Sequence, residues 1–253
     1  MKYEWKAEKR RMRIQQAMVI LLVLLCILGS KYLKTIPGNT VDNWQTQTKK
    51  GRNDKSFHEL VADLASLGLT EVTDEQLSTV ERNWDSIPEE FRESTEKLPM
   101  LLSLLGSGNY DYDTWEWTPS SNCIYSFDVE VFDCSNMYTN FLEGIKAISN
   151  QEFSITDVVE TVSNEDYDKG TGTQTVQFKY NGNMYTYDAE LEYDWFDLGM
   201  INFMNQMLKK EQNPKRLYYM SDGMQECIIF YCTPDWAIEF KNVTGYKLES
   251  KVH

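Results

Sequence analysis

A run of thirteen uncharged, mostly apolar residues lies just behind a basic N-terminus and constrains the chain more than any other feature. It extends from Ala17 to Gly29, or to about seventeen residues with its polar neighbours, which is near the lower length limit for a membrane-spanning helix. Met1 to Arg13 carries six basic and two acidic residues. An excess of basic residues beside a membrane-spanning segment keeps that end of the chain in the cytoplasm. We expect a cytoplasmic tail over residues 1–13 and an uncleaved, single-pass transmembrane helix over residues 14–33. This signal-anchor would hold the protein in the cell membrane, with the C-terminal domain outside.

Three other interpretations of this run are open. A cleaved secretory signal has the same charge pattern, but it needs small residues at its cleavage site, and the four residues LGSK from Leu28 offer a poor one. A lipoprotein would be modified at Cys26, where Leu25 occupies the position at which a small residue is expected. The third alternative is a buried helix of a cytosolic protein.

Beyond the run, the sequence divides into a linker and two subregions. Residues 34–55 are polar with little apolar periodicity, which is typical of a linker. Residues 56–109 show helical spacing, with capping-box patterns at Ser56 and Thr73. Residues 110–253 alternate between apolar and polar positions, as strands do. We therefore predict an α+β fold in which a helical subregion precedes an antiparallel sheet with helices packed on one face.

Within the helical subregion we expect a third helix that carries Phe91 and is disturbed by Pro99. In the sheet subregion, the strand that begins near Cys123 alternates apolar residues with Ser126 and Asp128, which we expect to face solvent. A helix should follow over residues 137–148.

Two hairpins and a final helix are predicted from turn signals. Asn181-Gly182 supplies the positive φ angles of a tight turn between two alternating runs. A second hairpin turns at Ser221-Asp222-Gly223. Its second strand, from Gln225 to Cys232, contains the run CIIFYC, which is apolar on both faces, so the strand should be central. Thr233-Pro234 should start the last helix and Gly245 should end it.

A resemblance to known proteins is carried by four segments: YSFDVEVFD, TVQFKYNGNMYTYDAELEYDWFDLGM, RLYYMSDGMQECIIFYC and TPDWAIEF. Together they resemble a family of uncharacterised bacterial domains that are membrane-tethered or secreted. The resemblance covers about residues 111–248. It implies an α+β fold and a place outside the cytoplasm, and it brings no assigned function and no site.

The charge of the chain limits the classes of partner that it can bind. The formal charge is −14 overall and −18 after Arg13. A domain this acidic repels phosphate backbones and has no Lys/Arg-rich stretch, so we expect no nucleic-acid partner. Cationic partners fit, and the alternative is that the charge only keeps an exposed domain soluble.

Histidine scarcity argues against several kinds of catalysis and cofactor. The sequence holds only His58 and His253, which disfavours Ser-His-Asp and Cys-His nucleophiles and a cysteine-histidine zinc site. Asp166, Asp168 and Gly170 superficially suit calcium, but the final acidic ligand of an EF-hand is missing and a hairpin loop explains the same letters. We predict no catalytic residues, no metal site and no cofactor.

Cysteines and acids leave two further possibilities open. Four cysteines remain outside the apolar run: Cys123, Cys134, Cys227 and Cys232. Outside the cytoplasm they permit two disulfides, and free buried thiols are the alternative. The last two should point to opposite faces of one strand, so they cannot pair with each other. Five acids lie among aromatic residues and are candidates for sugar hydrolysis by a carboxylate pair: Asp111, Asp113, Glu116, Asp194 and Asp197.

The most unusual stretch is NYDYDTWEW, from Asn109 to Trp117. Amphipathic aromatics in loops dominate recognition surfaces, so we mark Tyr110, Tyr112, Trp115 and Trp117 as candidate binding residues. The alternative is that the two tryptophans close the edge of the core beneath the N-terminal helices. We therefore expect a non-enzymatic, membrane-anchored domain that binds a protein, peptide or envelope component. Its alternatives are an immunity-type protein against a basic toxin and an envelope hydrolase that uses paired carboxylates.

Overall fold

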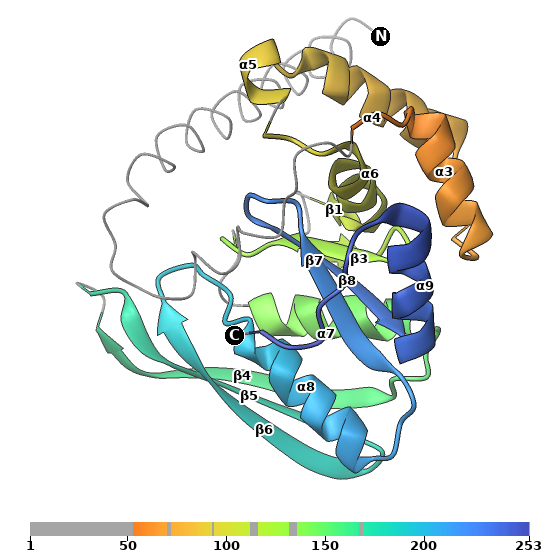
Figure 1. Ribbon diagram of the computed structural model, residues 1–253. Coiled ribbons are helices and arrows are strands. Elements are labelled where there is room, and N and C mark those ends of the chain that lie inside the picture. Colours follow the sequence, from red (N-terminus) through yellow and green to blue (C-terminus); the bar gives the residue numbers. More distant parts are fainter. Residues whose placement is uncertain are drawn as a thin grey trace, which may run out of the picture. The chain divides into compact units, whose positions relative to one another are not determined.

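The computed structural model divides the chain into two units, Met1–Asp42 and Asn43–His253. It describes residues 53–69, 72–92, 94–111, 116–131, 136–166 and 169–252, all of which belong to the second unit (Figure 1). The expected anchor and nearly all of the expected linker lie outside the described residues, so both stay predictions. Among the helices that are described, none combines the length and apolar character needed to cross a membrane.

Two helices begin at the predicted capping boxes. α3 (Phe57–Ser66) follows Ser56, whose hydroxyl accepts the Glu59 N–H at 3.2 Å while the Glu59 carboxylate accepts the Ser56 N–H at 2.7 Å. α4 (Asp74–Ser86) follows Thr73, which makes the same reciprocal bonds with the residue three positions on. These bonds occupy N–H groups that have no acceptor inside the helix. Both predicted starts are confirmed.

The expected third helix is divided in two. α5 (Glu89–Arg92) is a single turn that carries Phe91, and α6 (Lys97–Gly106) follows it. The predicted interruption is confirmed, since the helix that carries Phe91 ends at Arg92 and Pro99 lies in the first turn of the next helix, α6. A proline there loses no intrahelical hydrogen bond.

One sheet has the strand order β3-β8-β7 and is antiparallel throughout. Its strands are β3 (Tyr125–Asp128), β7 (Arg216–Ser221) and β8 (Glu226–Cys232). The central position of β8 confirms the prediction from its sequence, since its five residues from Cys227 to Tyr231 are all buried.

The other three-stranded sheet has the order β4-β5-β6 and is also antiparallel. Its strands are β4 (Ile155–Asp166), β5 (Thr171–Tyr180) and β6 (Asn183–Glu192). Asn181 and Gly182 join β5 to β6 with φ angles of 50° and 78°. The predicted hairpin is thus confirmed.

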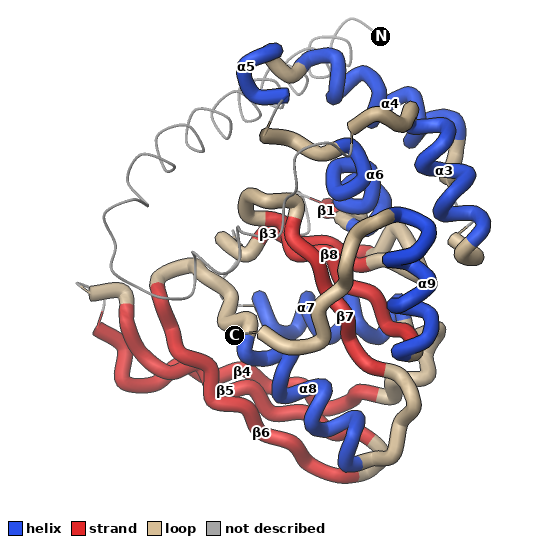
Figure 2. The backbone as a smooth tube through the Cα atoms, in the orientation of Figure 1, coloured by secondary structure: helices blue, strands red, loops and turns tan. Residues whose placement is uncertain are grey.

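Helices cover both faces of the β3-β8-β7 sheet (Figures 1 and 2). On one face, α3, α4, α6 and α9 (Pro234–Thr244) form a core with Ile228 and Phe230 of β8. On the other face, α7 (Met137–Ile148) and α8 (Gly199–Lys210) form a second core with Ile229 of β8 and the inner side of the β4-β5-β6 sheet. The α+β class with antiparallel sheets is confirmed, but the expected single sheet with helices on one face is wrong. Both faces of β8 are apolar, so each needs its own cover.

The first turn of α7 is held by a carboxylate from the neighbouring sheet. Glu160 of β4 accepts hydrogen bonds from the N–H and the hydroxyl of Thr139, each at 2.5 Å. Gln174 of β5 donates to the other Glu160 oxygen at 2.8 Å. A negative charge is favoured at a helix N-terminus, so this contact fixes α7 on the sheet.

Gly144 allows α7 to lie directly on Tyr125. A Cβ at this position would come within 2.6 Å of the Tyr125 ring, which is itself confined by Phe127 and Trp117 with ring centroids at 5.3 Å. We expect Gly144→Ala to lower the free energy of unfolding by about 1–3 kcal/mol because the site is overpacked, although helix propensity alone would favour Ala by about 1 kcal/mol.

Chemical denaturation measures this effect. Ser78→Ala, at an exposed position of α4, is the control and should change the free energy by less than about 0.5 kcal/mol. A Gly144→Ala variant as stable as the unaltered protein would contradict the close packing.

Candidate functional site

The aromatic stretch forms a short hairpin rather than an open connection. β1 (Asn109–Asp111) pairs with β2 (Glu116–Thr118), and Tyr110 is the direct backbone partner of Trp117. The Trp117 indole N–H donates to the Ser107 carbonyl at 2.9 Å, and its half-buried ring packs edge-on against Tyr125. Trp117 thus has a structural role in the core between the two sheets. Tyr112 and Trp115 lie outside the described residues, so their part in recognition stays a prediction.

The position of this hairpin against the end of α6 depends on Gly108. Its φ angle is 73°, and a Cβ there would lie 2.4 Å from the Trp117 indole nitrogen. Ser120 accepts the Gly108 N–H at 3.0 Å and donates to the Leu105 carbonyl at 2.8 Å. These bonds tie the hairpin to the end of α6, so its position is set by the fold.

Three carboxyl groups gather where β3 meets the turn between β7 and β8, and we call them the carboxylate cluster: Asp128, Asp222 and Glu226. Asp128 and Glu226 are direct partners across β3 and β8. Asp222 accepts the N–H groups of Met224 and Glu226 at 2.8 and 3.1 Å, which shapes the turn. The cluster is therefore a consequence of the register of this sheet.

Serine hydroxyls bind the innermost member of the cluster. Ser126 donates to Glu226 at 2.5 Å, and Ser103 of α6 lies 3.3 Å from the Ser126 hydroxyl. Ser126 is only 1% exposed, so the prediction that this side of β3 faces solvent is wrong. The reason is Gly106, where a Cβ would lie 2.7 Å from the Ser126 nitrogen. Without a side chain at that position, α6 lies directly on the strand.

Burial raises the pKa of all three carboxyl groups, and repulsion from neighbouring acids adds to this for Asp128 and Asp222. The pKa of Asp128 rises from 3.8 to about 7, because of burial and then because Glu226, Glu130 and Asp222 are close. The pKa of Asp222 rises from 3.8 to about 6, mainly through burial. Burial also raises the pKa of Glu226, against the hydrogen bonds from the serines. Carboxyl groups with a raised pKa keep their protons to a higher pH than ordinary acids do, a property that acid catalysis and pH sensing both use.

The acids that sequence reasoning selected have other roles where the structure describes them. Asp197 accepts the Gly199 N–H at 2.8 Å and the Tyr187 hydroxyl at 2.7 Å, which fixes the start of α8. Asp111 and Glu116 are backbone partners in the aromatic hairpin, and Asp113 lies outside the described residues. The Asp194 carbonyl accepts the Val131 N–H at 2.7 Å. Aromatic neighbours did not point to the carboxylate cluster. Acids within buried strands were the signal that could have located the carboxylate cluster.

The acidic loop considered for calcium joins β4 to β5. Asp166 forms an ion pair with Lys169 at 2.7 Å, and Asp168 lies outside the described residues. Within the part of the chain that the structure describes, no group of three or more His, Cys, Asp or Glu side chains is placed to hold a metal ion.

No disulfide joins two of the described cysteines. Cys227 and Cys232 are free, and the Cys123 thiol donates to the Asn122 side chain at 2.8 Å. Cys227 lies in the core between the sheets and Cys232 packs against the helical core, so the prediction that they face opposite sides of β8 is confirmed. Cys134 lies outside the described residues, and a disulfide to it stays a prediction.

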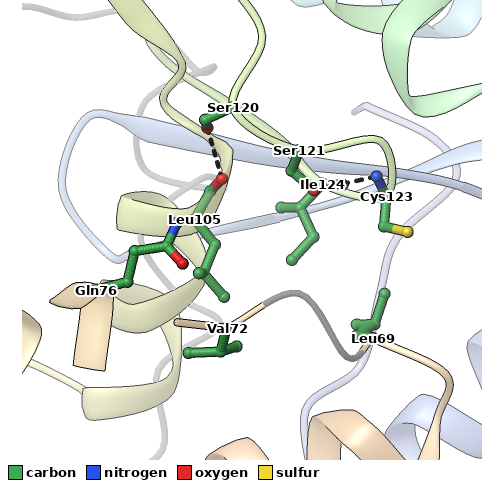
Figure 3. A pocket seen from close by; sticks show the side chains of 8 residues that line it. All are labelled: Leu69, Val72, Gln76, Leu105, Ser120, Ser121, Cys123 and Ile124. Carbon is green, nitrogen blue, oxygen red and sulfur yellow. Dashed lines mark hydrogen bonds between the residues drawn. The ribbon is translucent and has the colours of Figure 1, made fainter. Parts of the chain in front are cut away.

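A small cavity lies between the start of β3 and the helical layer (Figure 3). Leu69, Val72, Leu105 and Ile124 give it apolar walls, and its volume is about 20 Å³. That volume holds about one water molecule, which is far less than an organic ligand needs.

Comparison with known proteins adds no relative. No family model matches the chain, and neither a curated protein nor a solved structure matches it.

Proposed function

We propose that the protein is a single-pass membrane protein whose acidic unit lies outside the cytoplasm and binds a cationic protein, peptide or envelope component. The observation that supports this most is the excess of carboxylates. Residues 53–253 contain 14 Lys and Arg against 36 Asp and Glu, a formal charge of −22. Residues 1–52 contain 11 against 3, a charge of +8.

This excess leaves acids available to a partner. Even if every Lys and Arg in residues 53–253 paired with a different acid, 22 carboxylates would have no basic partner within that part of the chain. The described ion pairs are partly exposed, as in Lys179 with Asp157 and Lys215 with Glu152, and such pairs add little stability. A surface of one sign attracts partners of the other sign and speeds their association.

The proposed location rests on the sequence. The apolar run behind six basic residues favours an anchor with the acidic unit outside. A basic toxin is one partner that fits, and an immunity-type protein is the corresponding narrower proposal.

We expect the full-length protein, held in lipid nanodiscs, to bind a Lys-rich peptide of about ten residues with one-to-one saturation. Isothermal titration measures the stoichiometry, and a Glu-rich peptide of equal length is the control. Because the attraction is electrostatic, affinity should fall as salt rises from about 50 to about 200 mM. Equal binding of both peptides, or binding of neither, would contradict the proposal.

A hydrolase that uses paired carboxylates is the second proposal, and the observation that favours it is the cross-strand pair of Asp128 and Glu226 with raised pKa values. Release of reducing ends from envelope polysaccharide, lost in both Asp128→Asn and Glu226→Gln, would replace the binding proposal by this one.

A further inference from the structure

The two edges of the β4-β5-β6 sheet differ in regularity. β4 contains register shifts between Thr156 and Val159 and between Ser163 and Asp166, and positive φ angles at Asp157 and Asn164 accompany them. Bulges of this kind protect an edge strand from pairing with another chain. β6 pairs with β5 through ten consecutive partners without a register shift, so its outer edge is regular.

Part of this regular edge is open. The Glu190 N–H donates to the Asp197 carboxylate at 3.3 Å, so it points away from β5. Because the direction of the backbone N–H groups alternates along a strand, the N–H groups of Met184, Thr186 and Asp188 also point away from β5. Within the described residues no hydrogen bond joins the backbone groups of these three to any segment other than β5. Figure 1 shows β6 as the outermost strand of its sheet.

The side chains beside this edge define what could pair with it. Thr186, Asp188 and Glu190 are exposed on the outer face, and residues 183–197 contain five acids and no Lys, Arg or His. On the inner face, Tyr187 and Phe203 are half-buried with ring centroids 5.1 Å apart. A matching strand would therefore be basic on one face and apolar on the other.

We propose that the open edge of β6 accepts an extended peptide as an additional strand, with Lys or Arg at every second position and apolar residues between them. Backbone hydrogen bonds to Thr186 and Asp188 hold the peptide, its basic side chains lie beside Asp188 and Glu190, and its apolar side chains meet Phe203. A second copy of this chain is disfavoured on this edge, because its β6 acids would face the same acids. This inference rests on the proposed function and names the partner chemistry and the surface.

The test compares two peptides of about nine residues with the same composition, one alternating Lys and Val and one with Lys and Val in separate blocks. We expect the full-length protein to bind the alternating peptide at one-to-one stoichiometry and the block peptide about tenfold more weakly. Thr186→Pro removes the outward N–H at a position where an edge strand tolerates proline, and it should weaken binding of the alternating peptide about tenfold. Thr186→Val keeps the N–H and is the matched control.

The outcomes separate the two proposals. If both peptides bind equally and Thr186→Pro changes nothing, the edge inference is overturned while the proposed function stands. If neither peptide binds, the proposed function fails as well. If Thr186→Pro lowers the melting temperature, Asp188→Lys replaces it as the test variant. A basic side chain at the exposed edge repels the basic peptide without altering the backbone. Undiminished binding of the alternating peptide to Asp188→Lys would also overturn the inference.

Discussion

At pH 8, the Asp128→Asn variant is expected to have a free energy of unfolding about 1–3 kcal/mol above that of the unaltered protein, after allowance for solvent screening. The ordinary pKa of the Asp128 carboxyl is 3.8, and the fold raises it to about 7. The folded state therefore binds this proton more tightly than the unfolded state does. The stability that comes from the protonated group is fully present below about pH 4 and is lost as the pH rises through about 7.

The Asn side chain has no charge to bury, so its advantage over Asp should shrink steadily as the pH falls from 8 to 4. It also retains an oxygen that can accept the Glu130 N–H, which Asp128 accepts at 2.9 Å. Urea denaturation at a series of pH values measures the difference. The same direction applies to Asp222, whose pKa rises to about 6, so the unaltered protein should be less stable at pH 8 than at pH 5.

The control must remove the same charge from residues 53–253, whose net charge is −22, without altering the carboxylate cluster. Glu239→Gln does this, because Glu239 is exposed on α9. Its effect on stability should stay within about 0.5 kcal/mol at every pH. Identical pH profiles for the two variants would show that general repulsion, and not the cluster, sets the pH dependence.

The second large effect concerns the apolar run. We expect Leu22→Lys combined with Leu25→Lys to move the full-length protein from the membrane fraction to the soluble fraction of lysed cells. Each lysine near the centre of a spanning helix costs about 3 kcal/mol relative to leucine, and a run at the lower length limit cannot absorb two of them. Fractionation followed by immunodetection measures the shift. Leu22→Val with Leu25→Val keeps the run apolar and should leave the protein in the membrane fraction.

Local elements were predictable where one residue type has a geometric reason to be there. Thr233 and Gly245 show this for α9, since the Thr233 hydroxyl accepts the Trp236 N–H at 3.3 Å and Gly245 adopts a φ angle of 79°. The division of the strands between two sheets was not predictable from such signals. Alternation states which residues share a face, but it does not state which other strand or helix covers that face.

Two glycines illustrate what the sequence alone could not reveal. Gly106 and Gly144 both lie in helices, where their letters predict only weaker helix formation. In the structure they let α6 approach the Ser126 backbone and α7 approach the Tyr125 ring. The first contact covers a face of β3 that alternation assigned to solvent, and it helps to bury the carboxylate cluster.

Some candidate site residues were visible in the sequence, and others are brought together only by the fold. Trp117 stood out in the sequence because the stretch around it is rich in aromatic residues, and the structure places its ring against the core. Asp128 and Glu226 did not stand out, because they are 98 positions apart and meet only through the pairing of β3 with β8. Contacts of that kind depend on the completed topology, which local patterns do not encode.

The most direct test of the proposed location is a reporter enzyme, active only outside the cytoplasm, fused after residue 253 of the unaltered chain. The account predicts reporter activity in intact cells, with the fusion protein retained in washed membranes. Activity only from a matching cytoplasmic reporter at the same position, with the protein in the soluble fraction, would contradict it.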